Sequence, residues 1–184
     1  MLFLQAWMRN PLKVGSVTPS APALVSRMLA PIDWDHVQTV VELGAGTGPV
    51  TAEILQRTPP HVRFLTFERE PAFRELLTSR YPDLQIYPEA LELCRVLALT
   101  GRSTADVVIS GIPFAALPGP EQDLLLDEIN RALAPGGMFI AFQYSPQLYG
   151  RLKRRFADCR IAVVLGNLPP ALVYTCYTAS ESAG

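Results

Sequence analysis

Several features that would assign this sequence to a broad class are absent from it. No stretch approaches the roughly 20 consecutive apolar residues of a transmembrane helix, although 49% of the 184 residues are hydrophobic. The first residues, MLFL, lack the basic region and long apolar stretch of a secretory signal. The 16 Lys and Arg nearly balance the 17 Asp and Glu, so neither a broad basic surface for nucleic acid nor an acidic disordered chain is indicated. We expect a cytoplasmic protein of one domain that can still lie on a membrane.

Cysteine and histidine are scarce, with three and two residues. Cys94, Cys159 and Cys176 lie far apart and are odd in number, so no metal spacing or disulfide framework follows from them. We expect three free thiols in a reducing compartment. His36 and His61 lie beside turns and are expected on the surface. The sequence therefore predicts no metal site.

The chain does contain a long alternation of strand-like and helix-like segments. Short apolar, β-branched runs predict strands at 39–43, 64–67, 84–87, 106–109, 138–144, 161–165 and 172–177. Helical patterns cover 2–8, 21–29, 47–56, 71–79, 91–99, 121–133 (with Leu124, Leu125, Ile129 and Leu133 inward) and 147–156, and the Pro-Gly-Gly at 135–137 should form a turn. Such alternation predicts an α/β fold, a doubly wound, seven-stranded, mostly parallel sheet. The last two strands, joined by a short turn, should form an antiparallel hairpin.

The loop after the first strand carries the strongest functional signal. Gly44, Gly46 and Gly48 let the backbone turn sharply and approach a ligand closely, although such glycines can also serve only a tight strand-to-helix turn. Glu42 before the loop discourages a pyrophosphate ligand and suits a cationic amino acid or a ribose. Glu68 ends the second strand and can accept both hydroxyls of a ribose. Together these residues predict a site for S-adenosylmethionine (SAM).

Three segments resemble motifs of the class I SAM-dependent methyltransferases: 40–48 (VVELGAGTG), 67–68 (FE) and 133–137 (LAPGG). The resemblance covers about residues 37–178 and implies a Rossmann-like fold. It also implies that Glu68 binds the ribose, that Gly44 and Gly46 face the methionine part, and that Glu89 is the nearest candidate for the adenine amine. The expected cofactor-binding residues are Glu42, Gly44, Ala45, Gly46, Thr47, Gly48, Glu68, Arg69, Glu89, Ala90 and Ser110.

The loop at 110–114 (SGIPF) bears on the methyl acceptor. It is similar to the N-[IL]-P-[FY] loop of RNA adenine N6-dimethyltransferases, but Gly111 stands in place of the Asn whose side chain holds the target amine. Backbone carbonyls and Phe114 remain, and an aromatic wall suits an amine that becomes quaternary. Plain packing is the other explanation for Phe114. The candidate catalytic residues are Gly111, Ile112, Phe114 and Tyr144.

The N-terminal segment is basic and amphipathic. Arg9, Lys13 and Arg27 precede the first acid, Asp33, and Trp7 lies on an apolar helical side. This pattern suits an anionic lipid surface, as does a second basic cluster at 151–155. Packing of Trp7 on the core, with solvated cations, is the alternative. We expect residues 1–32 to form a membrane- and substrate-binding cap on a SAM-binding core at 33–184.

Segments 7–20, 110–114 and 167–173 resemble the short soluble bacterial phospholipid N-methyltransferases and the related ornithine-lipid enzymes. This resemblance implies methylation of phosphatidylethanolamine toward phosphatidylcholine, by direct attack of the neutral amine on the SAM methyl group, on the inner face of the membrane. Positioning and exclusion of water should supply most of the rate. Residues expected at the lipid are Trp7, Arg9, Lys13, Ser16 and Thr18. An RNA adenine N6-methyltransferase and a non-catalytic SAM-fold interaction protein remain as alternatives.

Overall fold

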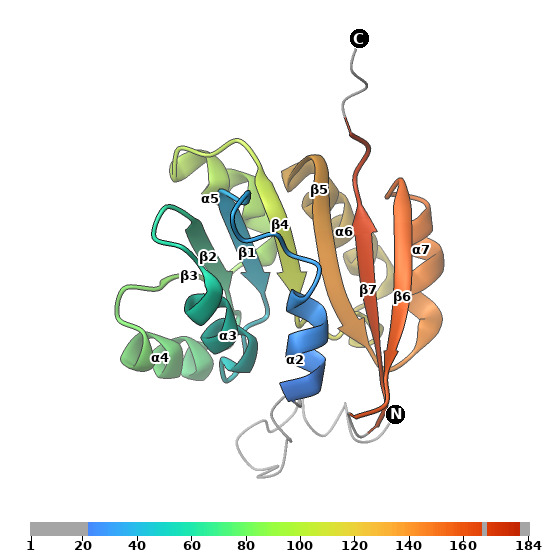
Figure 1. Ribbon diagram of the computed structural model, residues 1–184, viewed down its shortest axis with the longest axis horizontal. Helices are drawn as coiled ribbons and strands as arrows, with labels where there is room; N and C mark the ends of the chain where they lie inside the picture. The colour runs from blue at the N-terminus through green and yellow to red at the C-terminus, as the bar shows by residue number, and fades with distance from the viewer. Residues whose placement is uncertain (1–21, 167–168, 181–184) are drawn as a thin grey trace.

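The computed structural model describes residues 22–166 and 169–180. It contains one seven-stranded sheet with helices on both faces (Figure 1). The strands are β1 (Thr39–Leu43), β2 (Arg63–Phe67), β3 (Gln85–Tyr87), β4 (Ala105–Ser110), β5 (Leu133–Gln143), β6 (Asp158–Val164) and β7 (Ala171–Tyr177). The helices are α2 (Pro22–Leu29), α3 (Pro49–Arg57), α4 (Pro71–Arg80), α5 (Leu93–Leu99), α6 (Gly119–Ala132) and α7 (Tyr149–Lys153), with short 3-10 turns at Ala90–Glu92, Phe114–Ala116 and Pro146–Leu148.

The strand order confirms the predicted fold. It runs β3-β2-β1-β4-β5-β7-β6, with β1 to β5 parallel to their neighbours. The strand β7 runs antiparallel to both of its neighbours, β5 and β6. The chain winds from β1 toward β3 and then from β4 toward the other edge. The switch point therefore lies between β1 and β4, where ligands bind in sheets of this kind.

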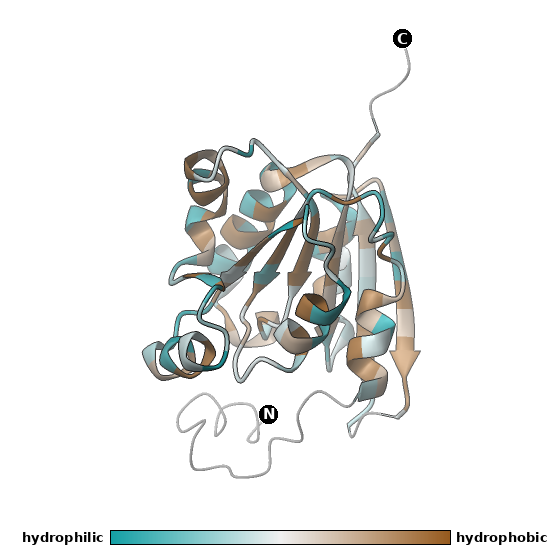
Figure 2. Cartoon of the chain, turned by 60° about the vertical axis from the view of Figure 1, so that its left-hand side comes forward, coloured by the Kyte–Doolittle hydropathy of each residue, from teal (hydrophilic) through white to brown (hydrophobic). Residues whose placement is uncertain are grey.

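The central strands are buried on both faces, which explains why they read as continuous apolar runs. In β1, Val40 belongs to the cluster that packs under α2 and α3, whereas Val41 belongs to the cluster under α5, α6 and α7. Figure 2 shows the hydrophobic strands enclosed between the two helical layers. Because this core holds the sheet rigidly, the loops at the strand ends start from fixed positions.

The helix α6 and the strand that follows it differ from the prediction. Leu124 is exposed, and Leu126 is buried in its place, because the buried stripe of α6 runs through Leu125, Leu126, Ile129 and Ala132. The predicted turn at 135–137 lies inside β5, which already begins at Leu133 by pairing with Ala105. The helix predicted at 147–156 is shorter, reduced to a 3-10 turn and α7.

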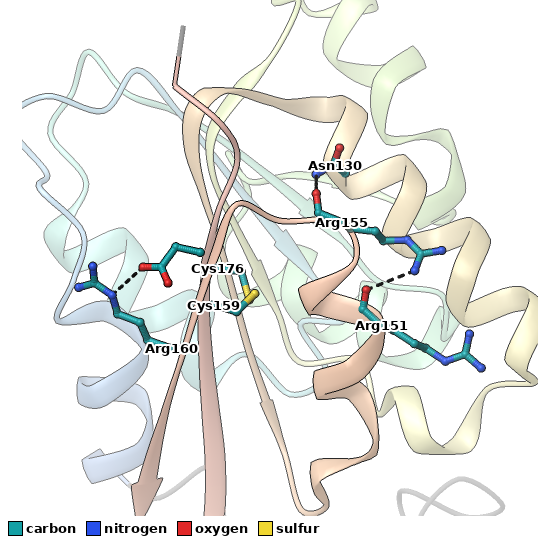
Figure 3. Close-up of a disulfide and its surroundings, with 7 residues drawn as sticks. Asn130, Arg151, Arg155, Cys159, Arg160 and Cys176 are labelled. Carbon is teal, nitrogen blue, oxygen red and sulfur yellow. Dashed lines mark hydrogen bonds and ion pairs between the residues drawn. A yellow bond between two sulfur atoms is a disulfide. The ribbon is translucent and has the colours of Figure 1, made fainter. Parts of the chain in front are cut away.

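The expectation of three free thiols is wrong for two of them. Cys159 on β6 and Cys176 on β7 face each other in the antiparallel register and form a disulfide (Figure 3). Cys94 is free. The sequence spacing gives no register between two strands, so this pairing became visible only in the folded sheet.

Candidate functional site

Three loops meet at the carboxyl edge of the sheet. Leu43, the last residue of β1, pairs with Phe67 of β2 on one side and with Ser110 of β4 on the other. The Gly44 N–H donates to the Phe67 carbonyl at 2.7 Å, and the Gly111 N–H donates to the Leu43 carbonyl at 2.8 Å. The strand register therefore brings the glycine loop, Glu68 and the 110–114 loop together, as predicted.

The three loop glycines have different surroundings. All have positive φ, at 74°, 56° and 86° for Gly44, Gly46 and Gly48. A Cβ on Gly44 would lie 2.8 Å from Cγ1 of Ile112, and one on Gly48 would lie 2.8 Å from Cδ2 of Leu77. A Cβ on Gly46 would meet no atom of residues 22–166 and 169–180 within 4 Å. The first and third glycines thus allow close packing, and the second leaves open space where a ligand can approach the backbone.

Glu68 is fixed against this loop by two backbone amides. Its Oε2 accepts the Gly46 N–H at 2.7 Å, and its Oε1 accepts the Glu70 N–H at 2.8 Å. The side chain is largely buried. A carboxylate can accept further hydrogen bonds on each oxygen, so Glu68 is held at the open side of Gly46 with capacity left for hydroxyl donors.

Glu42 is a buried acid, with an exposed fraction of only 2%. Burial raises the pKa of its carboxyl from 4.5 to about 8, and the nearby negative charge of Glu68 adds to this increase. A hydrogen bond donated by the Thr51 hydroxyl to Glu42 Oε2, at 2.7 Å, acts in the opposite direction. Glu42 is thus largely neutral at pH 7 in the absence of a cation, and a cationic ligand would favour its ionised form.

Of the other expected cofactor residues, Ala45 and Ser110 are buried, and the rest are exposed or half-buried. Thr47 is exposed, and α3 begins only at Pro49, which has no N–H to offer a ligand. Arg69 is exposed, with its guanidinium 3.9 Å from Glu121. Glu89 is exposed and Ala90 half-buried, at the start of the 3-10 turn after β3. In residues 22–166 and 169–180, no three His, Cys, Asp or Glu side chains group as metal ligands.

The 110–114 loop has no room for a side chain at its second residue. A Cβ on Gly111 would lie 2.7 Å from the Gly44 carbonyl oxygen. The hydroxyl of Ser110, itself buried, accepts the Ile112 N–H at 3.2 Å. Phe114 is buried and packs edge-to-face on Phe139, with ring centroids 6.5 Å apart. The structure supports the packing explanation for Phe114, although the residue also borders a cavity.

This cavity, of about 170 Å³, lies beside the ends of β4 and β5. Its lining residues are Phe114, Ala115, Gln122, Gln143, Ser145, Gln147, Leu148 and Arg151. Gln143 is only 4% exposed, and its Nε2 donates to the Ile112 carbonyl at 2.9 Å. The neighbouring Tyr144, which the sequence suggested, is exposed, packs on Phe142 and does not line the cavity. Sequence reasoning missed Gln143. The signal that could have found it is a polar residue at the very end of a buried strand.

The basic cluster at 151–155 is partly neutralised. Arg151 forms an ion pair with Asp123 of α6, and Arg155 pairs with both Asp123 and Asp127. Figure 3 shows Arg151 and Arg155 together, with Arg155 also donating to the Arg151 carbonyl. The pair of arginines lowers the pKa of the Asp123 carboxyl, Arg151 through a direct hydrogen bond above all. These cations therefore tie α7 to α6.

The predicted lipid-contacting residues Trp7, Arg9, Lys13, Ser16 and Thr18, and the helix expected at 2–8, lie outside the described residues. Among the residues that are described, no helix is long and apolar enough to cross a membrane.

Comparison with known proteins identifies a methyltransferase domain in the part of the chain that contains the glycine loop, Glu42 and Glu68. A methyltransferase domain family matches residues 40–137. An ornithine lipid N-methyltransferase from Singulisphaera acidiphila is 35% identical over 187 aligned positions, which cover 98% of this chain and 97% of that protein.

Two solved structures have the same fold at low identity. The O-methyltransferase TomG from Streptomyces achromogenes in complex with SAM has a TM-score of 0.69 at 18% identity, covering 95% of this chain and 87% of that one. The N-methyltransferase NodS from Bradyrhizobium japonicum WM9 in complex with S-adenosyl-l-homocysteine has a TM-score of 0.68 at 14% identity, covering 95% and 97%. With a site suited to SAM and a family match over more than half its length, the chain belongs to the class I SAM-dependent methyltransferases.

Proposed function

We propose that this enzyme methylates the amine in the head group of a membrane lipid. The observation that carries the proposal is the relative named an ornithine lipid N-methyltransferase, which aligns with nearly the whole chain at 35% identity. The sequence resemblance adds phosphatidylethanolamine, methylated toward phosphatidylcholine, as a second acceptor. Both lipids offer a primary alkyl amine beside an anionic group.

The site supports an alkyl amine better than a nucleobase. The cofactor supplies an electrophilic methyl group, so the chain must hold a neutral amine in line with it and exclude water. The Asn of the adenine-modifying loop is replaced by Gly111, and a Cβ there would meet the Gly44 carbonyl at 2.7 Å. A planar base would thus lose the side-chain acceptor that positions it. An alkyl amine needs only the backbone carbonyls and small polar groups nearby.

An aliphatic stripe on the outer strand supports a lipid acceptor. Ile161, Val163 and Leu165 are 41%, 58% and 78% exposed, and they alternate along β6 and its end. Val163 pairs with Leu172 of β7, which pairs with Gln143 of β5. Val163 is therefore two strands away from Gln143, and the stripe lies roughly 10 Å from the cavity at the same edge of the sheet. Acyl chains can therefore lie against these residues while the head group enters the cavity. This arrangement, together with the expected N-terminal cap, favours peripheral contact with the membrane.

Methyl transfer from tritiated SAM tests the proposal directly. The full chain is incubated with vesicles that contain phosphatidylethanolamine, ornithine lipid, or only phosphatidylcholine, and in parallel with ribosomal RNA. We expect label in one or both aminolipids and none in the phosphatidylcholine vesicles. Label in the RNA, with none in either aminolipid, would show that the adenine alternative is correct.

A further inference from the structure

The acceptor loop has no side-chain amide at Gly111, and a neighbouring strand offers one. Gln143 ends β5, which pairs with β4 directly beside the 110–114 loop. Its side chain is buried, borders the cavity and donates from Nε2 to the Ile112 carbonyl at 2.9 Å. A buried amide in this place is costly unless its polar atoms are used.

The hydrogen bond to Ile112 fixes which way the amide points. A carbonyl oxygen can only accept, so the NH₂ group of Gln143 must face Ile112 and the amide oxygen must face elsewhere. Within residues 22–166 and 169–180, no donor reaches this oxygen. In the same residues, the side-chain polar atoms that lack a partner and are fully buried are Arg63 Nε and Thr66 Oγ1. Oε1 of Gln143 also lacks a partner in this part of the chain but is not one of these fully buried atoms. It is therefore an accessible acceptor, and the hydrogen bond to Ile112 holds it in orientation before any ligand binds.

We propose that Oε1 of Gln143 accepts an N–H of the acceptor amine, and that the cavity binds the aminoalkyl end of the acceptor. This inference rests on the proposed function. Gln143, on the neighbouring strand β5, then supplies the side-chain acceptor that Gly111 lacks. Because an amide oxygen is a neutral acceptor, it holds the amine without stabilising the ammonium form as a carboxylate would, and only the neutral amine can attack a methyl group.

Arg151 lines the same cavity and can bind the anionic group that such an acceptor carries beside its amine. One of its nitrogens is paired with Asp123, and a guanidinium has five N–H donors in all. The remaining donors suit a planar or tetrahedral anion. The acceptor is therefore a short alkyl amine that also carries an anion, either the phosphate of an ethanolamine lipid or the carboxylate of an ornithine lipid.

The role of Gln143 predicts an unequal effect on successive methylations. A neutral primary amine has two N–H groups, a monomethyl amine has one, and a dimethyl amine has none. The contact with Oε1 can therefore assist the first transfer but not the last. A residue that only shaped the loop would affect every transfer alike.

Gln143→Met tests this difference, with Gln122→Met as the matched control. Gln122 lines the same cavity and also donates its amide to a backbone carbonyl, that of Leu117, at 2.9 Å. The kcat/KM of each full-length protein is measured on vesicles with the primary amine lipid and with its N,N-dimethyl form, in separate ethanolamine and ornithine arms. For Gln143→Met we expect a loss of kcat/KM on the primary amine that is about tenfold larger than the loss on the dimethyl form, because both forms lose the loop contact with Ile112 but only the primary amine loses its own hydrogen bond. Gln122→Met should not change the ratio of the two.

The outcomes separate the two proposals. If wild-type protein labels neither lipid, the proposed function fails and this inference with it. If wild-type protein is active and Gln143→Met lowers both activities equally, only this inference is overturned. A circular dichroism spectrum and a SAM affinity that match wild type show that Gln143→Met is folded, so that an equal loss on both lipids cannot be ascribed to a folding defect. The lipid with the lower KM, the ethanolamine or the ornithine lipid, shows whether Arg151 binds a phosphate or a carboxylate.

Discussion

Replacing Glu42 by glutamine should make the stability of this protein much less dependent on pH. Glu42 is buried and has a pKa of about 8 in the folded chain, against an ordinary value of 4.5. Glutamine has nearly the same shape, can still accept the Thr51 hydroxyl hydrogen bond, and does not titrate. The substitution therefore removes the proton linkage and leaves the packing in place.

The sign follows from which state binds the proton more tightly. The raised pKa means that the folded state holds the proton at pH values where the unfolded chain has lost it. The favourable contribution of Glu42 is fully present below pH 4.5 and is lost as the pH rises to about 8. A shift from 4.5 to about 8 corresponds to about 5 kcal/mol across that interval. Glu42→Gln should accordingly gain several kcal/mol over wild type at pH 8 relative to pH 5.

Urea unfolding at pH values from 5 to 9, followed by circular dichroism without cofactor, measures this gain. Glu75→Gln is the matched control, because Glu75 is exposed on α4 and far from the loop glycines in sequence. Its stability curve should run parallel to that of wild type. Parallel curves for wild type and Glu42→Gln over the whole pH interval would refute the reasoning, because they would mean that Glu42 does not change its proton affinity on folding.

Three further predictions concern Gly111, Glu68 and the disulfide. Gly111→Ala should lower the free energy of unfolding by about 1–3 kcal/mol in denaturant titrations and weaken SAM binding, because its Cβ meets the Gly44 carbonyl; wild-type values would contradict this contact. Glu68→Ala should weaken SAM binding by at least about tenfold in calorimetry, and unchanged affinity would show that the ribose assignment is wrong. Reductant should destabilise the chain by about 3 kcal/mol, given a sequence separation of 17 residues between Cys159 and Cys176, but should have no effect on the Cys159→Ala/Cys176→Ala variant.

The sequence predicted the fold well because its main signal is local. The strand at 39–43 matches β1 residue for residue, since a buried, β-branched run between turns has few other conformations available. Boundaries set by distant partners were less accurate. The start of β5 at Leu133 depends on pairing with Ala105, and the exposure of Leu124 depends on which stripe of α6 meets the sheet. Neither can be read from the segment alone.

For a similar reason, the sequence predicted that the glycine loop, Glu42 and Glu68 lie together, but it did not predict the place of Gln143. Glu42, the glycines and Glu68 follow their strands at once, so a parallel sheet must bring them together. Gln143 becomes meaningful only when β5 lies beside β4 and the amide meets the Ile112 carbonyl. Tyr144, one residue further, was the choice from the sequence because it is a polar residue at the end of the predicted fifth strand. The alternation of side chains along a strand puts it on the opposite face.

The buried state of Glu42 has a bearing on how the site discriminates among ligands. In the free protein its proton is retained up to a pH of about 8, because desolvation and the charge of Glu68 both oppose ionisation. A ligand with a positive charge near Glu42 would compensate for that desolvation and release the proton, whereas a neutral analogue would gain nothing from the carboxyl. The buried carboxyl of Glu42 thus lowers the stability of the free protein at neutral pH but favours the binding of a cationic ligand. A glutamine at this position has no charge and would not provide this selectivity. SAM affinity in wild type should then increase as the pH rises from 6 to 8, and that increase should be absent in Glu42→Gln.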